Sequence, residues 1–252
     1  MDLQELVEAA LLEQHRWEFN CEYMYRKGLR SVPIDRACLL DMLRTFGVAR
    51  NLSRIGTHNL YQKLPKIAEC HRLSPHDWKT IFQLTSEKSI KTEDRDLYIE
   101  GSPLTNREPR AFVSGLTKVL WFAGSHEMPM FDRFTCNAVR PAGDTQAAKA
   151  ADYITKLIKY WGYQEVYDKI NLSKINLELS WCFFPERFLD KILFLKGLDR
   201  AGFADHALMG TQARRDIYLQ SLSEVSREEL KALCSSISCN IKDTSFLKKL
   251  GT

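Results

Sequence analysis

No apolar run in this sequence approaches the roughly 18 residues that a membrane-spanning helix needs. The first residues, MDLQELVEAALLEQHRWEF, carry acids where a signal peptide needs basic residues, so they predict a helix of the mature protein. The cysteines, 7 in number, are scattered without the spacing of a disulfide framework, which favours reduced thiols. We therefore expect a cytoplasmic protein without a membrane partner.

The chain also lacks the short motifs of several enzyme classes. It has no zinc-ligand spacing, no Walker loop and no glycine triplet of a nucleotide-binding site, and it shows no internal repeat or low-complexity segment. The acids at Glu93, Asp94 and Asp96 are compatible with a metal nuclease. They lie in a charge-rich stretch with Lys91 and Arg95, however, and such a stretch is more often merely solvated. We expect no metal and no cofactor.

What remains is an ordinary globular composition, with 44% hydrophobic and 27% charged residues. At 252 residues, the chain is long enough for one large domain or two small ones. The net charge of +4 is compatible with a polyanionic partner but does not by itself identify one.

Apolar residues recur at helical spacing and alternating strand patterns are scarce, which predicts an all-α fold. We expect a single domain over 1–252, which can be divided into two helical lobes joined near 92–107. Helices are predicted from Leu3 onward, through residues 39–43 to Gly47, from a Ser74 cap, and from Pro109 toward Ala123, where an interruption at Gly115 is left open. Further helices are predicted from Asp144 through Tyr160, from Pro185 to Gly197, and after a Ser226–Glu229 capping box.

Two charges stand out in "SGLTKVLWFAGSHEMPMFDRFTCNAV", residues 114–139. Lys118 precedes a strongly apolar run, and Asp132 lies between Phe131 and Phe134. Charges beside so much apolar surface need a structural partner or a chemical role. The structural alternatives are an N-cap for Asp132, ahead of the helix "RFTCNAV", and a surface position on an amphipathic helix for Lys118. The cap and a chemical role can hold together.

This stretch resembles the centre of the helix-hairpin-helix DNA glycosylases, especially the 8-oxoguanine branch. On that resemblance Gly115 lies in the phosphate-binding hairpin, Lys118 begins the second hairpin helix, and Asp132 is the catalytic aspartate after the Met-Pro-Met segment. Lys118 and Asp132 are 14 residues apart, which is shorter than in the longer family members and closer to the compact bacterial proteins of similar fold.

The resemblance implies a two-lobed DNA glycosylase that acts, as a monomer, on double-stranded DNA with a flipped modified base. Asp132 would stabilise the oxocarbenium-like transition state, and Lys118 would either attack the sugar, giving lyase activity, or hold a phosphate. The apolar run after Lys118 favours the nucleophile, because desolvation helps a lysine to lose its proton. Further contacts implied for DNA are Gly115, Thr117 and Arg133, and those implied for the base pocket are Trp121 and Phe131, although buried tryptophans more often belong to the core.

The implied substrate is an oxidised purine, for repair, or a hypermodified phage base, for antiphage defence. The alternative is a non-catalytic helical module of the same fold that binds DNA or another protein. The single hairpin glycine, Gly115, favours this alternative, because the family usually has two glycines there.

A second segment, "RTFGVARNLSRIGTHN", bears on DNA binding. Arg44, Arg50 and Arg54 lie near the turn at Gly47, with small polar residues between them. Arginine and small polar side chains are the usual phosphate contacts, so we expect these arginines to contact DNA. The alternative is a solvated basic face.

Overall fold

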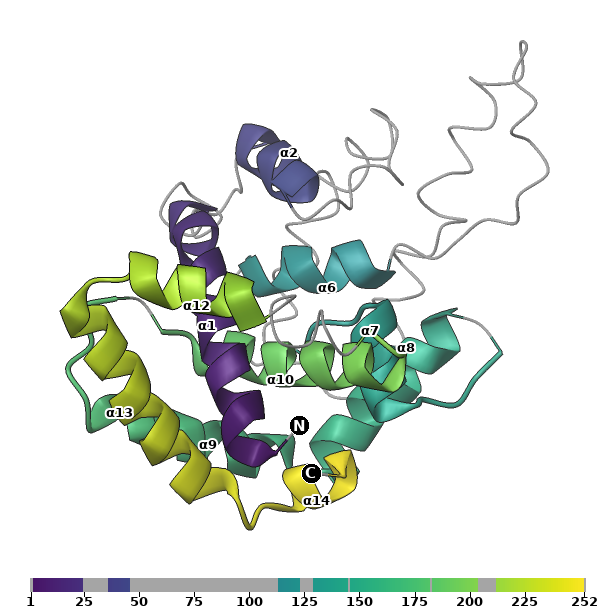
Figure 1. The fold of residues 1–252 in the computed structure, drawn as a ribbon. Coiled ribbons are helices and arrows are strands. Elements are labelled where there is room, and N and C mark those ends of the chain that lie inside the picture. Colours follow the sequence, from purple (N-terminus) through teal and green to yellow (C-terminus); the bar gives the residue numbers. More distant parts are fainter. Residues whose placement is uncertain are drawn as a thin grey trace. The chain divides into compact units, whose positions relative to one another are not determined.

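The computed structural model describes residues 2–24, 36–45, 113–122, 129–144, 146–181, 183–203 and 212–251. Within these ranges the secondary structure is helical and no strand is present, which confirms the all-α prediction (Figure 1). The elements are α1 (Leu3–Met24), α2 (Arg36–Thr45), α6 (Val113–Phe122), α7 (Arg133–Val139), α8 (Gln146–Thr155), the π-helix η3 (Lys156–Tyr160), α9 (Tyr163–Ile175), α10 (Pro185–Arg200), α12 (Gln212–Ser221), α13 (Glu224–Ile241) and α14 (Ser245–Leu250).

The chain divides into two compact units. The first comprises Met1–Phe19, Asp132–Pro141 and Tyr153–Thr252, and the second comprises Asn20–Phe131 and Ala142–Asp152. Asp132 is thus the first residue of the first unit after the chain leaves the second. The junction predicted near 92–107 lies outside the described residues, as does the helix predicted to start at Ser74.

Helix α10 is the central helix of the first unit and packs against both α7 and α9 (Figure 1). Its sequence, PERFLDKILFLKGLDR, is buried on nearly every side although it carries several charges, and its first residue is a proline, which suits the start of a helix. Phe188, Ile192 and Leu193 on this helix are completely buried. The all-round burial of α10 makes it the scaffold on which shorter elements of the first unit are held.

The sequence pattern predicts that α10 ends at Gly197, but the helix continues to Arg200. A Cβ atom on residue 197 would lie 1.7 Å from the carbonyl oxygen of Phe134. The glycine is therefore required by the close approach of the α7 backbone to α10. The sequence pattern alone does not distinguish a glycine that permits a helix crossing from a glycine that terminates a helix.

One other helix boundary differs from the predictions, and one predicted helix changes its type along its length. Helix α13 starts earlier than the Ser226–Glu229 pattern indicated, since the Ser223 hydroxyl accepts the 3.1 Å bond from the Ser226 N–H. Glu229 instead accepts hydrogen bonds from the backbone N–H and the hydroxyl of Ser180. The predicted run to Tyr160 is correct, but its last five residues form the π-helix η3.

In the second unit, α2 packs against α6. Met42 and Leu43 are completely buried on α2, which ends at Thr45, close to the predicted end. Helix α6 runs through Gly115 without an interruption. In the described part of the chain, no helix has the length and apolar character that crossing a membrane requires.

Candidate functional site

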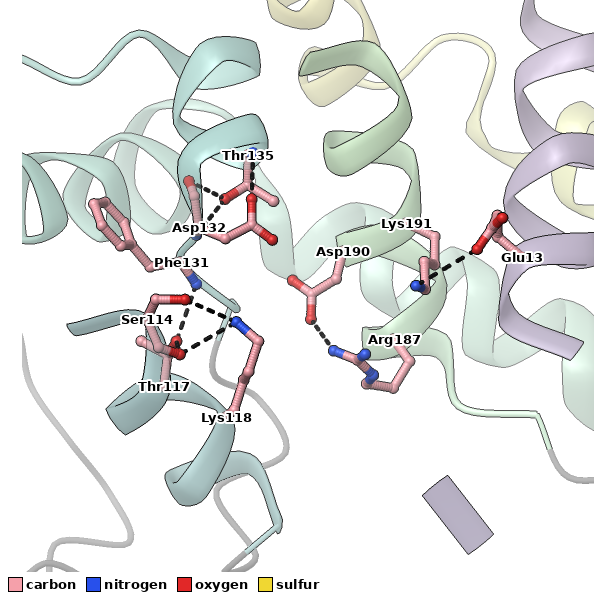
Figure 2. A network of polar contacts seen from close by, with 10 residues as sticks. All are labelled: Glu13, Ser114, Thr117, Lys118, Phe131, Asp132, Thr135, Arg187, Asp190 and Lys191. Atoms are coloured by element: carbon pink, nitrogen blue, oxygen red, sulfur yellow. Dashed lines mark hydrogen bonds and ion pairs between the residues drawn. The ribbon is translucent and has the colours of Figure 1, made fainter. Parts of the chain in front are cut away.

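Asp132 forms the N-cap of α7 in a reciprocal capping box. Its backbone is extended, with φ −147°, and its Oδ1 accepts hydrogen bonds from the backbone N–H groups of Phe134 (2.9 Å) and Thr135 (2.8 Å). In return, the Asp132 N–H donates to the Thr135 hydroxyl at 2.9 Å (Figure 2). The structure therefore confirms the interpretation of Asp132 as a helix cap.

The cap uses only one of the two carboxylate oxygens. Both hydrogen bonds from α7 end on Oδ1, and Oδ2 accepts none from any residue that the structure describes. The side chain is half-buried, so the carboxylate is neither enclosed in the core nor fully solvated. Oδ1 fixes the orientation of the carboxyl group, which leaves Oδ2 in a defined position and able to interact with another molecule.

Contacts at both ends hold α7 in place. The Phe134 ring packs edge-to-face on Phe194, with 5.3 Å between ring centroids, beside the backbone contact at Gly197. At the C-terminal end the Arg200 guanidinium donates to the Ala138 carbonyl, and Lys156 Nζ donates to the Arg140 carbonyl at 2.8 Å. A helix of only seven residues gains from these contacts the fixed position that an electrostatic site requires.

Tyr153 supports the cap from within the core. The side chain is completely buried, and its hydroxyl hydrogen bonds with Thr135. Burial first, and then the nearby carboxylates of Asp190 and Asp132, raise the pKa of Tyr153 well above its usual value. Sequence reasoning did not identify Tyr153 or Thr135, although the spacing Asp-x-x-Thr is a signal for the latter.

A buried charged cluster on α10 belongs to the same unit. Arg187 and Asp190 form an ion pair at 3.1 Å, and each is about 95% buried (Figure 2). Glu186 is also buried, and burial, reinforced by Asp190, raises the pKa of its carboxyl to about 7. The Tyr163 hydroxyl is buried as well and has no hydrogen-bond partner among the described residues. Sequence reasoning did not identify this cluster, because three charges on consecutive helical turns resemble a solvated face.

Lys118 lies on α6 in the second unit and is not a surface lysine, since its exposed fraction is 9%. Its Nζ donates to the carbonyl oxygen of Ser114 at 3.2 Å and to the Ser114 hydroxyl at 2.9 Å (Figure 2). The lysine is the sixth residue of α6, and Gly115 is buried in the first turn. The hairpin assignment of Gly115 and the helix-start assignment of Lys118 therefore need correction, because one continuous helix includes both.

The DNA-contact prediction for Thr117 is wrong for this structure. Its side chain is completely buried, donates to the Ser114 carbonyl, and accepts a 3.1 Å bond from the Phe131 N–H. That bond fastens to α6 the residue that immediately precedes Asp132. Thr117 therefore has a structural role.

The predicted base pocket also requires correction. Trp121 is completely buried, and Phe131 is 6% exposed, so neither ring offers a face on which a base could stack. Their apolar surface is used for packing, which is the more common role of such residues.

Two of the predicted phosphate contacts are exposed. Arg133, in the first turn of α7, has its guanidinium 5.9 Å from the Phe134 ring centroid, and Arg44 lies in the last turn of α2. Arg50 and Arg54 lie outside the described residues. Asp132 and Arg133 belong to the first unit, whereas Lys118, Gly115 and Arg44 belong to the second, so the structure describes the two groups separately.

Comparisons of the chain with protein-family models, curated proteins and solved structures find no match. Among the described residues, no three His, Cys, Asp or Glu side chains are grouped so that they could hold a metal ion. The functional proposal therefore depends on the local chemistry of the Asp132 carboxylate and on the motif around it.

Proposed function

We propose that the protein is a DNA glycosylase that excises a modified base from double-stranded DNA. The observation that carries this proposal is the Asp132 carboxylate, which is oriented through Oδ1 while Oδ2 accepts no bond from the described residues. The motif resemblance supplies the reaction class, and the oriented carboxylate supplies the group that this reaction needs.

Cleavage of an N-glycosidic bond places positive charge on the deoxyribose as the base leaves with the bonding electrons. A carboxylate near C1′ stabilises this oxocarbenium character, and the stabilisation is strongest where water is scarce. Water then adds at C1′ and loses its proton, which leaves an abasic site. Asp132 is suited to this role because its position is set before substrate binds and because Phe131 and Phe134 flank it in the chain.

For Lys118 we propose a role without covalent chemistry. Both Ser114 acceptors bind protons of Nζ, so an attack on the sugar would first require the ammonium to leave these bonds. The hydrolytic mechanism needs no such rearrangement. This proposal reverses the preference for a nucleophile that the apolar run after Lys118 had suggested.

The second candidate is a non-catalytic helical module that binds DNA or another protein. The burial of Thr117 and Trp121 favours it, because neither can make the DNA or base contact that the glycosylase family implies. This module would retain the α6 and α7 framework and lack base excision.

Release of base from a panel of substrates separates these candidates. The panel contains duplexes with oxidised purines and phage DNAs with hypermodified bases, since both remain proposed substrates of a monomeric cytoplasmic enzyme. We expect free base and abasic sites from at least one substrate, with activity retained in EDTA, which a metal nuclease would not show. DNA binding without base release from any substrate would support the non-catalytic module.

The Asp132→Asn variant tests the catalytic assignment. The amide oxygen can still cap α7 but has lost the negative charge, so we expect base release to fall by roughly 10²–10³-fold with folding and DNA binding retained. The matched control is Asp168→Asn, which removes an exposed carboxylate on α9 that, among the described residues, accepts a hydrogen bond only from Gln164. Near-normal turnover by Asp132→Asn would show that Asp132 is only a cap.

A further inference from the structure

Arg140, which follows α7, has an unusual backbone conformation. Its φ is 53°, and it is the one non-glycine residue with positive φ among the residues described. Its backbone is fully engaged, since its N–H donates to the Cys136 carbonyl at 2.7 Å and its carbonyl accepts from Lys156. The guanidinium is exposed and has no partner in the described part of the chain. Glycine would adopt this conformation with less strain, so local folding does not explain the arginine.

Other cations gather around the same helix end. The Arg200 guanidinium donates to the carbonyl of Ala138 in α7 and, at 2.7 Å, to the carbonyl of Leu250 in α14, so these two C-termini meet at one side chain. Lys248 and Lys249 are exposed in the last turn of α14. We define Arg140, Arg200, Lys248 and Lys249 together as the basic edge.

The charges of the basic edge are only partly balanced. Burial, and then the positive charge of Arg140, lower the pKa of the Arg200 guanidinium. Asp199 opposes this shift, but its carboxylate is also 3.9 Å from Lys196. Arg200 binds helix carbonyls, whereas the heads of Arg140, Lys248 and Lys249 face solvent without a partner among the described residues.

We propose that the basic edge binds the phosphate backbone of double-stranded DNA. The proposal rests on the proposed function for its choice of polyanion. An arginine guanidinium binds a phosphate through paired N–H donors, and lysine ammonium groups add point charges beside it. These contacts position a protein on a duplex without reading its sequence. All four residues belong to the first unit, which also contains Asp132.

The Arg140→Gly variant tests the proposal, because it removes the charge and also relieves the backbone strain. We expect its thermal stability to equal or exceed that of the wild type. Its affinity for a short unmodified duplex should fall roughly eightfold at about 0.1 M salt. The slope of log K against log[salt] should become shallower by about 0.9, the value for one phosphate contact. Fluorescence anisotropy over a salt series measures both quantities.

The matched control is Arg227→Gln, which removes an exposed arginine from α13. We expect this control to bind as the wild type does, and the Lys248→Gln, Lys249→Gln double variant to lose up to two contacts in the same assay. Unchanged affinity and salt dependence in Arg140→Gly would overturn the proposal. Arg140-dependent binding to RNA or to phosphatidylserine vesicles, without binding to the duplex, would also overturn it.

The outcomes also separate this inference from the proposed function. Loss of base release in Asp132→Asn combined with normal duplex binding by Arg140→Gly would leave the glycosylase intact and overturn the basic edge. Arg140-dependent duplex binding without base release from any DNA would support the basic edge and overturn the glycosylase.

Discussion

The two charged residues of the central motif are held in opposite ways. The Asp132 carboxylate contributes one oxygen to its own helix, and its second oxygen accepts nothing from the described residues. The Lys118 ammonium is buried and directs two of its bonds back to Ser114, one turn earlier in α6. The sequence presents both as charges beside apolar residues, yet only the carboxylate retains an atom oriented for another molecule.

The difference shows that burial is not what prepares a charged group for chemistry. A buried charge whose donors are already occupied must break those bonds before it can react, whereas a half-buried group with one fixed atom keeps the other available. Fixing the first atom also removes the orientational freedom that a surface carboxylate would have to lose when substrate binds.

Disrupting the packing that supports α7 should have the largest effect on stability, and it should also disturb the orientation of Asp132. In Gly197→Ala the added Cβ would lie 1.7 Å from the Phe134 carbonyl oxygen, and neither backbone can yield as a flexible side chain would. We expect a loss of about 3 kcal/mol or more in the free energy of unfolding. Urea denaturation measures it, and surviving folded protein should lose base release because Asp132 moves with α7.

Gly202→Ala provides the control, because a Cβ at residue 202 would meet none of the described residues within 4 Å. Its φ of 80° means that alanine there still carries backbone strain, of about 1 kcal/mol. Equal destabilisation in the two variants would show that α7 can shift without difficulty, and the fixed orientation of Asp132 would then have no basis.

The buried Glu186 carboxyl in the first unit predicts a pH dependence of the protein's stability. Its carboxyl has a pKa of about 7 in the folded protein, mainly because of burial, against about 4.5 when unfolded. The folded state therefore binds the extra proton between these values, and stability falls as pH rises through this window. Removing the charge in Glu186→Gln should stabilise the protein by about 3 kcal/mol at pH 8 and hardly at all at pH 4.5.

Denaturation curves at the two pH values, compared with those of Glu178→Gln at an exposed site, check this prediction. A gain that is the same at both pH values would mean that packing by the amide, and not the loss of a buried charge, is responsible.

Sequence reasoning found those parts of the fold that depend on local pattern. The apolar spacing of α1, the proline at the start of α10 and the position of Asp132 ahead of an apolar turn each identify an element without knowledge of its neighbours. Gly197 was misassigned because a terminating glycine and a crossing glycine look alike until α7 is placed beside it. Tyr153 went unnoticed for the same reason, since its link to Thr135 spans two helices that are separate in the sequence.

Substitution of Lys118 should have the smallest effect on activity. In Lys118→Gln the amide can still donate to Ser114, so one of the two hydrogen bonds between these two residues is retained while the charge is lost. If Asp132 directs water, the rate of base release should stay within about tenfold of the wild type. A loss of this size is typical of removing a positioning contact, whereas removing a nucleophile lowers the rate far more.

Borohydride reduction during turnover separates the two mechanisms directly. A lysine that attacks C1′ displaces the base and forms a Schiff base, which borohydride converts into a stable protein–DNA adduct. The arrangement of Nζ on Ser114 predicts full base release by the wild-type protein, an intact strand carrying an abasic site, and no trapped complex. An adduct with wild-type protein that disappears in Lys118→Gln would mean that the ammonium leaves Ser114 during the reaction. The contrast between an available carboxylate and an occupied lysine would then describe only the resting protein.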